Sequence, residues 1–171
     1  MSLPDAEALL AALTDQMRPV VTRETALVGI HTGGVWLARR LHASLGLVPP
    51  LGTLDVSFYR DDYKRIGLHA DVKPSAIPFD VAGRHIVLVD DVLFTGRTIR
   101  AALNELFDYG RPESVRLAAL VDRGGRELPI CAQFVGAAVE IGPDEHIELN
   151  QDGASRLSLT LVRRPRVAPA S

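Results

Sequence analysis

Cysteine is nearly absent from this chain of 171 residues, which contains only Cys131. A single cysteine excludes an intramolecular disulfide framework and a cysteine-based metal cluster, and it favours a cytoplasmic protein in which Cys131 is a buried, inert thiol. No apolar run approaches the roughly 18 residues that cross a membrane. The first residues lack a basic start and carry Asp5 and Glu7, so we expect no signal peptide.

An excess of one charge is also lacking, because 19 Lys and Arg residues face 21 Asp and Glu residues, for a formal net charge of −2. This balance excludes a protein-wide attraction to nucleic acid and leaves only a local basic face. The length and the 47% apolar content are typical of one soluble globular domain over residues 1–171. The basic end, with Arg163, Arg164 and Arg166, is expected to fray in solvent.

Helical and strand-like segments alternate along the chain. The expected strands are 26–30, 53–58, 86–89 and 115–121, and short strands and turns follow residue 123. Expected helices start behind a Ser2–Asp5 capping box, near Leu37 and near Ile99, and they stop near Pro19, Gly46 and Gly110. The third helix is expected to bury Ile99, Ala102, Leu103, Leu106 and Phe107. This alternation predicts an α/β fold with a mostly parallel sheet and helices on both faces.

Residues 59–84 form a long polar connection that begins with Tyr59, Arg60, Asp61 and Asp62 and continues through Lys64 and Arg65. A structureless connection beyond about 12–15 residues is usually a lid or a binding loop, so we expect a mobile segment over a site. A plain β-hairpin arm is the alternative, and the two are compatible.

The most informative segment is an apolar strand that ends on two acids. Residues 86–89 suit a parallel strand covered on both faces, and Asp90 and Asp91 fall at its carboxyl end, where ligands of such sheets bind. Residues 95–98, Thr-Gly-Arg-Thr, then open a helix whose N–H groups and hydroxyls favour a dianionic phosphate. The two acids suit sugar hydroxyls, so a 5-phosphorylated ribose fits both parts. The plainer alternative is that the acids only cap the strand.

Neither a Walker loop nor a Rossmann glycine loop occurs in the sequence. Residues 86–98 instead resemble the thirteen-residue signature of type I phosphoribosyltransferases. Together with residues 59–62, 110–112, 121–124 and 126–130, they make nearly the whole chain similar to the PyrR family, the pyrimidine operon regulators that also act as uracil phosphoribosyltransferases.

This resemblance implies a five-stranded twisted sheet, a hood at 122–150 and a flexible loop over the site. The implied reaction joins uracil to 5-phosphoribosyl 1-pyrophosphate (PRPP) and yields UMP and pyrophosphate. Mg²⁺ would bind to the pyrophosphate, without direct protein ligands. A homodimer or homotetramer and an mRNA leader are the implied partners, with no membrane.

The resemblance also implies roles for individual residues. Asp90 and Asp91 would hold the ribose hydroxyls and favour positive charge on the ring, and Arg60 would close on the leaving group. Uracil would contact Phe94, Asp122 and Arg123. The PRPP-binding residues would be Thr32, Gly33, Gly34, Asp90, Asp91, Val92, Leu93, Phe94, Thr95, Gly96, Arg97 and Thr98.

The choice of base depends mainly on this resemblance. Purine-specific relatives carry an acid where this chain has Phe94, and an apolar side chain cannot transfer a proton. Orotate enzymes use cationic loop side chains, which Lys64 or Arg65 could imitate, so orotate is disfavoured mainly by the family match.

Two departures from the family pattern concern cations. Residues 31–34 read His-Thr-Gly-Gly where many members have Lys-Thr-Arg-Gly, so pyrophosphate contact must rely on Mg²⁺, amides and Arg60. His31 is either a strand-end packing residue or, less simply, a catalyst. Arg126 is the retained candidate for RNA binding, while Gly125 and Cys131 replace a His and an Arg, which predicts weaker RNA binding. Two functions stay open: a uracil-salvage enzyme, or an RNA-binding attenuator that senses UMP and PRPP with incidental turnover.

Overall fold

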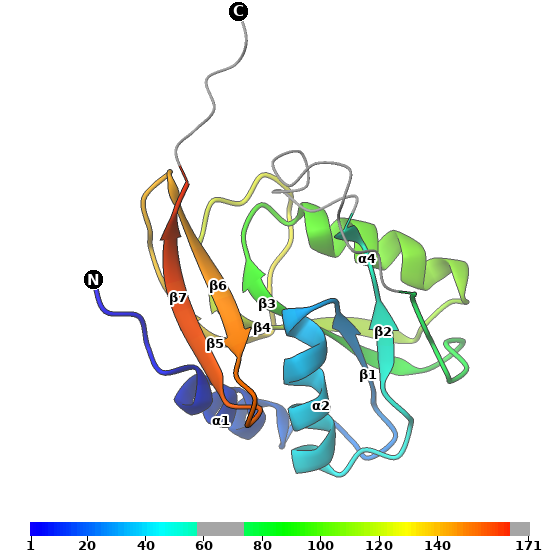
Figure 1. Cartoon of the computed structure of the whole chain (residues 1–171). Coiled ribbons are helices and arrows are strands. Elements are labelled where there is room, and N and C mark those ends of the chain that lie inside the picture. Colours follow the sequence, from blue (N-terminus) through cyan, green and yellow to red (C-terminus); the bar gives the residue numbers. More distant parts are fainter. Residues whose placement is uncertain (58–73, 165–171) are drawn as a thin grey trace, which may run out of the picture.

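The computed structural model describes residues 1–57 and 74–164 of the chain, and Figure 1 labels the elements. Three helices and seven strands are named within these ranges: α1 (Ala6–Met17), β1 (Ala26–Ile30), α2 (Gly33–Leu45), β2 (Gly52–Leu54), β3 (His85–Leu93), α4 (Arg97–Asp108), β4 (Ser114–Asp122), β5 (Phe134–Ala138), β6 (Glu145–Gln151) and β7 (Leu157–Arg163).

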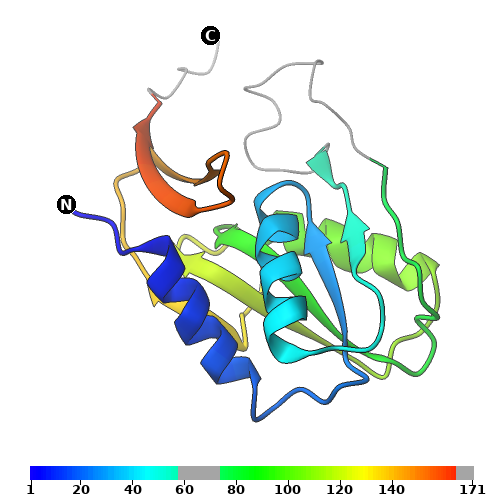
Figure 2. The same cartoon turned by 60° about the horizontal axis from the view of Figure 1, so that its bottom comes forward.

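The central sheet has five strands in the order β2-β1-β3-β4-β5, and every neighbouring pair is parallel. Helices α1 and α2 lie on one side of it and α4 on the other (Figure 1, Figure 2). Alternate residues of β1 enter the two resulting cores, with Leu27 facing α1 and α2 and Val28 facing α4. The α/β fold with a five-stranded parallel sheet is therefore confirmed.

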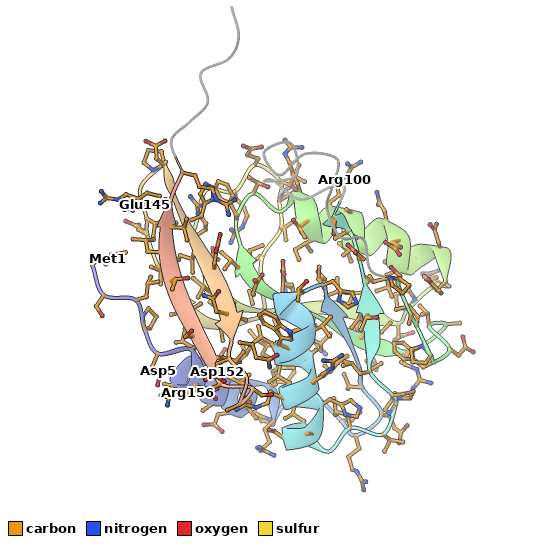
Figure 3. All side chains as sticks on the ribbon, viewed as in Figure 1. Met1, Asp5, Arg100, Glu145, Asp152 and Arg156 are labelled. Carbon is orange, nitrogen blue, oxygen red and sulfur yellow. The ribbon has the colours of Figure 1, made fainter. Side chains whose placement is uncertain are left out.

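A second, antiparallel sheet consists of β6 and β7. Its buried residues Ile147, Leu149 and Leu157 extend the core under α1 and α2. The turn between the two strands, with Asp152 and Arg156, lies beside Asp5 at the start of α1 (Figure 3). A contact between distant parts of the chain holds it there: Glu7 of α1 accepts hydrogen bonds from Arg40 Nη2 at 2.7 Å and from Leu157 N at 2.9 Å.

Replacing Glu7 by Gln should destabilise the chain by about 1 kcal/mol near pH 7, because an ion pair and a charge-assisted hydrogen bond weaken. The hydrogen bonds from Arg40 and then from Leu157 hold the pKa of Glu7 below its ordinary 4.5. The contribution is therefore complete above the unfolded carboxyl's pKa and is lost as pH falls through the lower folded value. Urea unfolding at a series of pH values should show the two stability curves converging in acid. The exposed Glu140→Gln is the control, and a constant difference at all pH values would contradict this assignment.

Several local expectations were wrong. Strand β2 ends at Leu54 instead of residue 58, because Asp55 Oδ1 accepts the N–H of Ser57 at 2.9 Å and turns the backbone away from the ladder. Asp5 alone caps α1, accepting from Glu7 N at 3.2 Å, in place of a Ser2 capping box. On α4 the buried stripe follows Ile99, Ala102 and Leu106, so Phe107 falls beside it and is 52% exposed.

Two other side chains are placed differently from expectation. Cys131 is exposed, because its neighbours Ile130 and Ala132 take the inward positions of an alternating segment. Arg163 ends β7, and Arg164 Nη2 donates to Glu148 Oε1 at 2.6 Å, so this part of the basic end is ordered by pairing. Arg166 lies outside the described residues.

The hood at 122–150 stays a prediction, and the structure places its residues in three regions of the fold. Residues 123–130 hydrogen-bond to the turn after β3. Strand β5 pairs with β4 in the central sheet and contacts α1, with Phe134 buried in the core. The β6–β7 sheet continues to Arg163. Of the expected loop at 59–84, residues 59–73 lie outside the described ranges; in the remainder, Ala76 forms an antiparallel bridge with Thr53 of β2. In the part of the chain that the structure describes, no helix has the length and apolar character of a membrane span.

Candidate functional site

The strand order creates a switch point between β1 and β3. The chain leaves β1 through α2 toward β2 on one side and leaves β3 through α4 toward β4 on the other. The turns that follow β1 and β3 therefore start side by side at the carboxyl ends of these strands and continue in opposite directions. Ligands of open α/β sheets bind at such a point. The two predicted phosphate-binding segments, 32–34 and 90–98, meet at these carboxyl ends.

Glycines allow these two turns to touch. A Cβ atom added to Gly33 would lie 2.5 Å from Asp91 Oδ2, and one added to Gly34 would lie 2.3 Å from the carbonyl oxygen of Val89. The peptide bond between His31 and Thr32 is cis. The two Cβ distances show that the backbone of Gly33 and Gly34 lies directly against residues 89–91, with no room for a side chain between them. The acids were expected at the end of the strand, but β3 continues past them to Leu93.

The acid pair is held by its own backbone. Asp90 is 4% exposed, and its Oδ1 accepts the N–H of Asp91 at 3.0 Å, while Asp91 Oδ1 accepts the N–H of Val92 at 2.9 Å. These local bonds are the ones that a purely structural acid pair would also make, and they fix the direction of both carboxylates. Asp91 Oδ2 faces Gly33, so this carboxylate lies between the two turns.

The next turn leads into the N-terminus of α4. Gly96 is the N-cap with a φ of 94°, and a Cβ there would meet Ile130 Cγ1 at 2.9 Å, so both conformation and space require glycine. The Oγ1 atom of the buried Thr95 accepts the N–H of Arg97 at 3.2 Å. The first N–H groups of a helix have no acceptor within the helix, which suits this turn to a phosphate.

The segment after β4 closes on this turn through main-chain bonds. Arg123 N donates to Leu93 O at 3.0 Å, and the N–H groups of Glu127 and Leu128 donate to Thr95 O at 3.0 and 3.1 Å. Outside them, Arg97 Nη2 and Glu127 Oε2 form an exposed ion pair at 2.9 Å. We name residues 123–130 the bracing loop.

The predicted uracil residues gather where the bracing loop begins. The guanidinium carbon of Arg123 lies 3.8 Å from the centroid of the Phe94 ring, a cation–π contact, and Asp122 ends the adjoining strand. Residues 94–96, between β3 and α4, are named the signature turn. Sequence reasoning missed the contacts of Glu127 and Ile130 with this turn. The only available signal was the 126–130 segment itself, which carried a resemblance but no role.

Three other predicted residues need separate mention. Arg60 lies outside the described residues, as do Lys64 and Arg65, so their proximity to the site stays a prediction. His31 N donates to Leu54 O at 2.9 Å, which joins the ends of β1 and β2, and the role of its side chain stays a prediction. The guanidinium of Arg126 is directed into the protein, where its Nε donates to Ile130 O and its Nη1 donates to Phe94 O.

Gly125→Ala should destabilise the chain more than Gly124→Ala, by about 1–3 kcal/mol. Both glycines have positive φ values, 71° at Gly124 and 78° at Gly125, so both substitutions carry a similar backbone cost. A Cβ at Gly125 would lie 2.5 Å from Phe94 Cε2, whereas one at Gly124 meets nothing within 4 Å. Urea unfolding measures the difference, and shifted Phe94 ring resonances should accompany it. Equal stabilities would show that the ring adapts without cost.

Comparisons with known proteins agree with this geometry. The family described as "Phosphoribosyl transferase domain" matches residues 3–146. The "Bifunctional protein PyrR" of Nitrosococcus oceani is 52% identical over 156 residues, covering 90% of this chain and 88% of that protein. The protein of the same name from Pseudomonas paraeruginosa is 52% identical over 175 aligned residues, covering 100% of both.

A solved hypoxanthine-guanine phosphoribosyltransferase from Bacillus anthracis superposes with a TM-score of 0.63, covering 81% of this chain and 83% of that one. At 18% identity this likeness shows the shared type I phosphoribosyltransferase fold and nothing about the base. The family match and the PyrR relatives, which align over almost their whole length, go further. The chain belongs to the phosphoribosyl transferase domain family and, within it, to the PyrR proteins.

Proposed function

We propose that this protein transfers the 5-phosphoribosyl group of PRPP to uracil. The observation that carries the proposal is the packing of Gly33 and Gly34, the first residues of α2, against Asp90 and Asp91, which precede the N-terminus of α4 by a few residues. These parts offer one site for pyrophosphate, ribose and 5-phosphate in that order. Membership of the PyrR proteins supports a pyrimidine as the acceptor.

The reaction breaks the bond between ribose C1 and the pyrophosphate oxygen and forms a bond from C1 to uracil N1, whose proton is released to solvent. Positive charge develops on the ribose ring as pyrophosphate leaves. Asp90 and Asp91 accept hydrogen bonds from the ribose hydroxyls, and their negative charge stabilises this transition state more than the ground state. Residues 95–98 hold the 5-phosphate, and the backbone of Gly33 and Gly34 faces the leaving group.

Uracil occupies the side of the site formed by Phe94, Asp122 and Arg123. Phe94 stands immediately before the Thr95–Gly96 turn, so no carboxylate is available there to exchange a proton with a purine ring. The Arg123 guanidinium on the Phe94 ring gives this side both an apolar surface and donors. Arg60, from the segment outside the described residues, is proposed to close on the pyrophosphate.

Mg²⁺ is proposed to enter with PRPP, where it neutralises charge on the pyrophosphate as that group leaves. Among residues 1–57 and 74–164, no group of three or more His, Cys, Asp or Glu side chains could hold a metal ion. The proposed ion is therefore bound by the phosphates of the substrate, and Asp90 and Asp91 are left to the ribose hydroxyls.

Regulation of pyrimidine genes is the second proposed function, favoured by the word "bifunctional" in the names of the relatives. In this role UMP and PRPP occupy the same pocket while the protein binds an mRNA leader. RNA affinity should then fall steeply with added salt, and a flat response would reject the idea. A homodimer or homotetramer and a cytoplasmic location stay predictions, the first checked by sedimentation and the second by fractionation.

The test of the main function is a panel of bases. The purified protein is mixed with PRPP and Mg²⁺, and pyrophosphate release is measured in parallel with uracil, orotate, hypoxanthine and guanine. Release with uracil alone is expected. Release with a purine or orotate instead would overturn the acceptor, and UMP binding without release from any base would leave the regulator as the function.

A further inference from the structure

Arg126 donates hydrogen bonds to three separate parts of the site. Its Nε donates to Ile130 O at 2.9 Å, its Nη1 donates to Phe94 O at 2.7 Å, and its Nη2 donates to a carboxylate oxygen of Asp122. These acceptors are the end of the bracing loop, the signature turn and the end of β4. One guanidinium thus uses a donor on each of its nitrogens to fix three backbone segments.

The side chain is substantially removed from solvent, with 25% of Arg126 and 22% of Asp122 exposed. For Asp122, burial is the largest influence and raises the pKa, but the hydrogen bonds from Arg126 and from Gly124 N outweigh it, so the net pKa is lowered. The charged form of Asp122 therefore depends on Arg126. Removing the guanidinium would leave a partly buried carboxylate without its compensating charge.

Two of these three partners, Phe94 and Asp122, belong to the proposed uracil side of the site. The third, Ile130, packs on Gly96 at the phosphate turn. The contact between Arg123 and the Phe94 ring also requires that the start of the bracing loop and the signature turn keep their spacing. Arg126 joins the two by direct hydrogen bonds from a side chain that is mostly removed from solvent.

We propose that Arg126 is a positioning residue for the acceptor base, holding Phe94 and Asp122 in place through its three-way hydrogen bonding. This inference rests on the proposed transfer to uracil. It gives Arg126 a task that lysine cannot perform, because an ammonium lacks the planar fork that reaches several acceptors in fixed directions. An arginine whose task was only to supply charge to RNA phosphates would tolerate lysine far better.

The test compares Arg126→Gln and Arg126→Lys by steady-state kinetics with uracil and PRPP varied separately. Both variants should raise the KM for uracil about tenfold, the loss expected when charge-assisted hydrogen bonds no longer hold the binding side chains. The KM for PRPP should stay within about twofold, because Thr95 O in the phosphate-binding turn keeps its hydrogen bonds from Glu127 N and Leu128 N. A lysine variant with wild-type KM values, or equal increases for both substrates, would overturn the proposal.

Two controls match this design. Glu127→Gln removes the exposed ion pair with Arg97 that links the same two segments, and Arg39→Gln removes one exposed positive charge from α2. Both should leave the KM for uracil within about twofold, because exposed pairs and single surface charges contribute little. A tenfold effect of either control would overturn the assignment to Arg126.

A measurement without turnover separates this inference from the proposed function. Carbon NMR of the Asp122 carboxyl should show its pKa raised in both Arg126 variants, and the Phe94 ring resonances should shift. If the wild-type protein failed to use uracil but these changes occurred, the proposed transfer to uracil would be wrong and the positioning role of Arg126 would be correct. Unchanged Asp122 and Phe94 signals would reject this positioning role whether or not uracil is used.

Discussion

Asp91→Asn is expected to lower turnover of uracil about 100-fold while changing stability by less than about 1 kcal/mol. Asparagine retains an Oδ1 atom that can accept the N–H of Val92, so the local turn survives. What is lost is the negative charge beside the ribose ring as pyrophosphate departs. Because this interaction strengthens in the transition state, kcat and kcat/KM should fall together, with little change in the KM for PRPP.

Initial rates of pyrophosphate release at saturating substrates measure the effect, and urea unfolding checks the fold. Asp80→Asn is a matched control: Asp80 is exposed, its Oδ1 also accepts a nearby backbone N–H, that of Ala82 at 3.1 Å, and it precedes the opposite end of β3. The control should keep its activity. If Asp91→Asn retained turnover within about threefold, the acids would be no more than a strand cap.

Gly34→Ala should destabilise the folded chain by about 3 kcal/mol, because its Cβ would meet main chain instead of a movable side chain. The nearest atom is the carbonyl oxygen of Val89 at 2.3 Å, and the Cα of Asp90 follows at 3.2 Å. Alanine inside a helix is ordinarily favourable by about 1 kcal/mol, so the collision must outweigh a helix-propensity gain. Thermal and urea unfolding measure the net effect.

Gly33→Ala offers an informative comparison at the neighbouring position. Its Cβ would lie 2.5 Å from Asp91 Oδ2, a side-chain atom that can move, so this variant should fold and lose activity through a displaced carboxylate. Gly153→Ala is the control for both, since a Cβ there meets nothing within 4 Å. If Gly34→Ala were as stable as the Gly153→Ala control, the close approach of the two turns would be incorrect.

The parts that sequence reasoning predicted well are those that a short stretch specifies. The apolar run before Asp90 is a buried parallel strand, and Gly46, with a φ of 62°, ends α2 where a glycine stop was expected. Errors arose where a distant or neighbouring contact overrode the pattern. Phe107 matched the helical spacing but lies beside the stripe that the sheet covers, and Cys131 alternates outward between two packed neighbours.

The sequence by itself determined the alternation of strands and helices, the acid pair, the Thr95–Gly96 turn and the family, because spacing and local backbone preference act over a few residues. Only the tertiary structure decided that Gly33 lies against Asp91, and that the bracing loop covers the signature turn. It also decided that Arg126 points inward to Phe94 and Asp122 instead of outward as a free cation. These contacts depend on the order of strands in the sheet and on how tightly their connections pack, which no local pattern specifies.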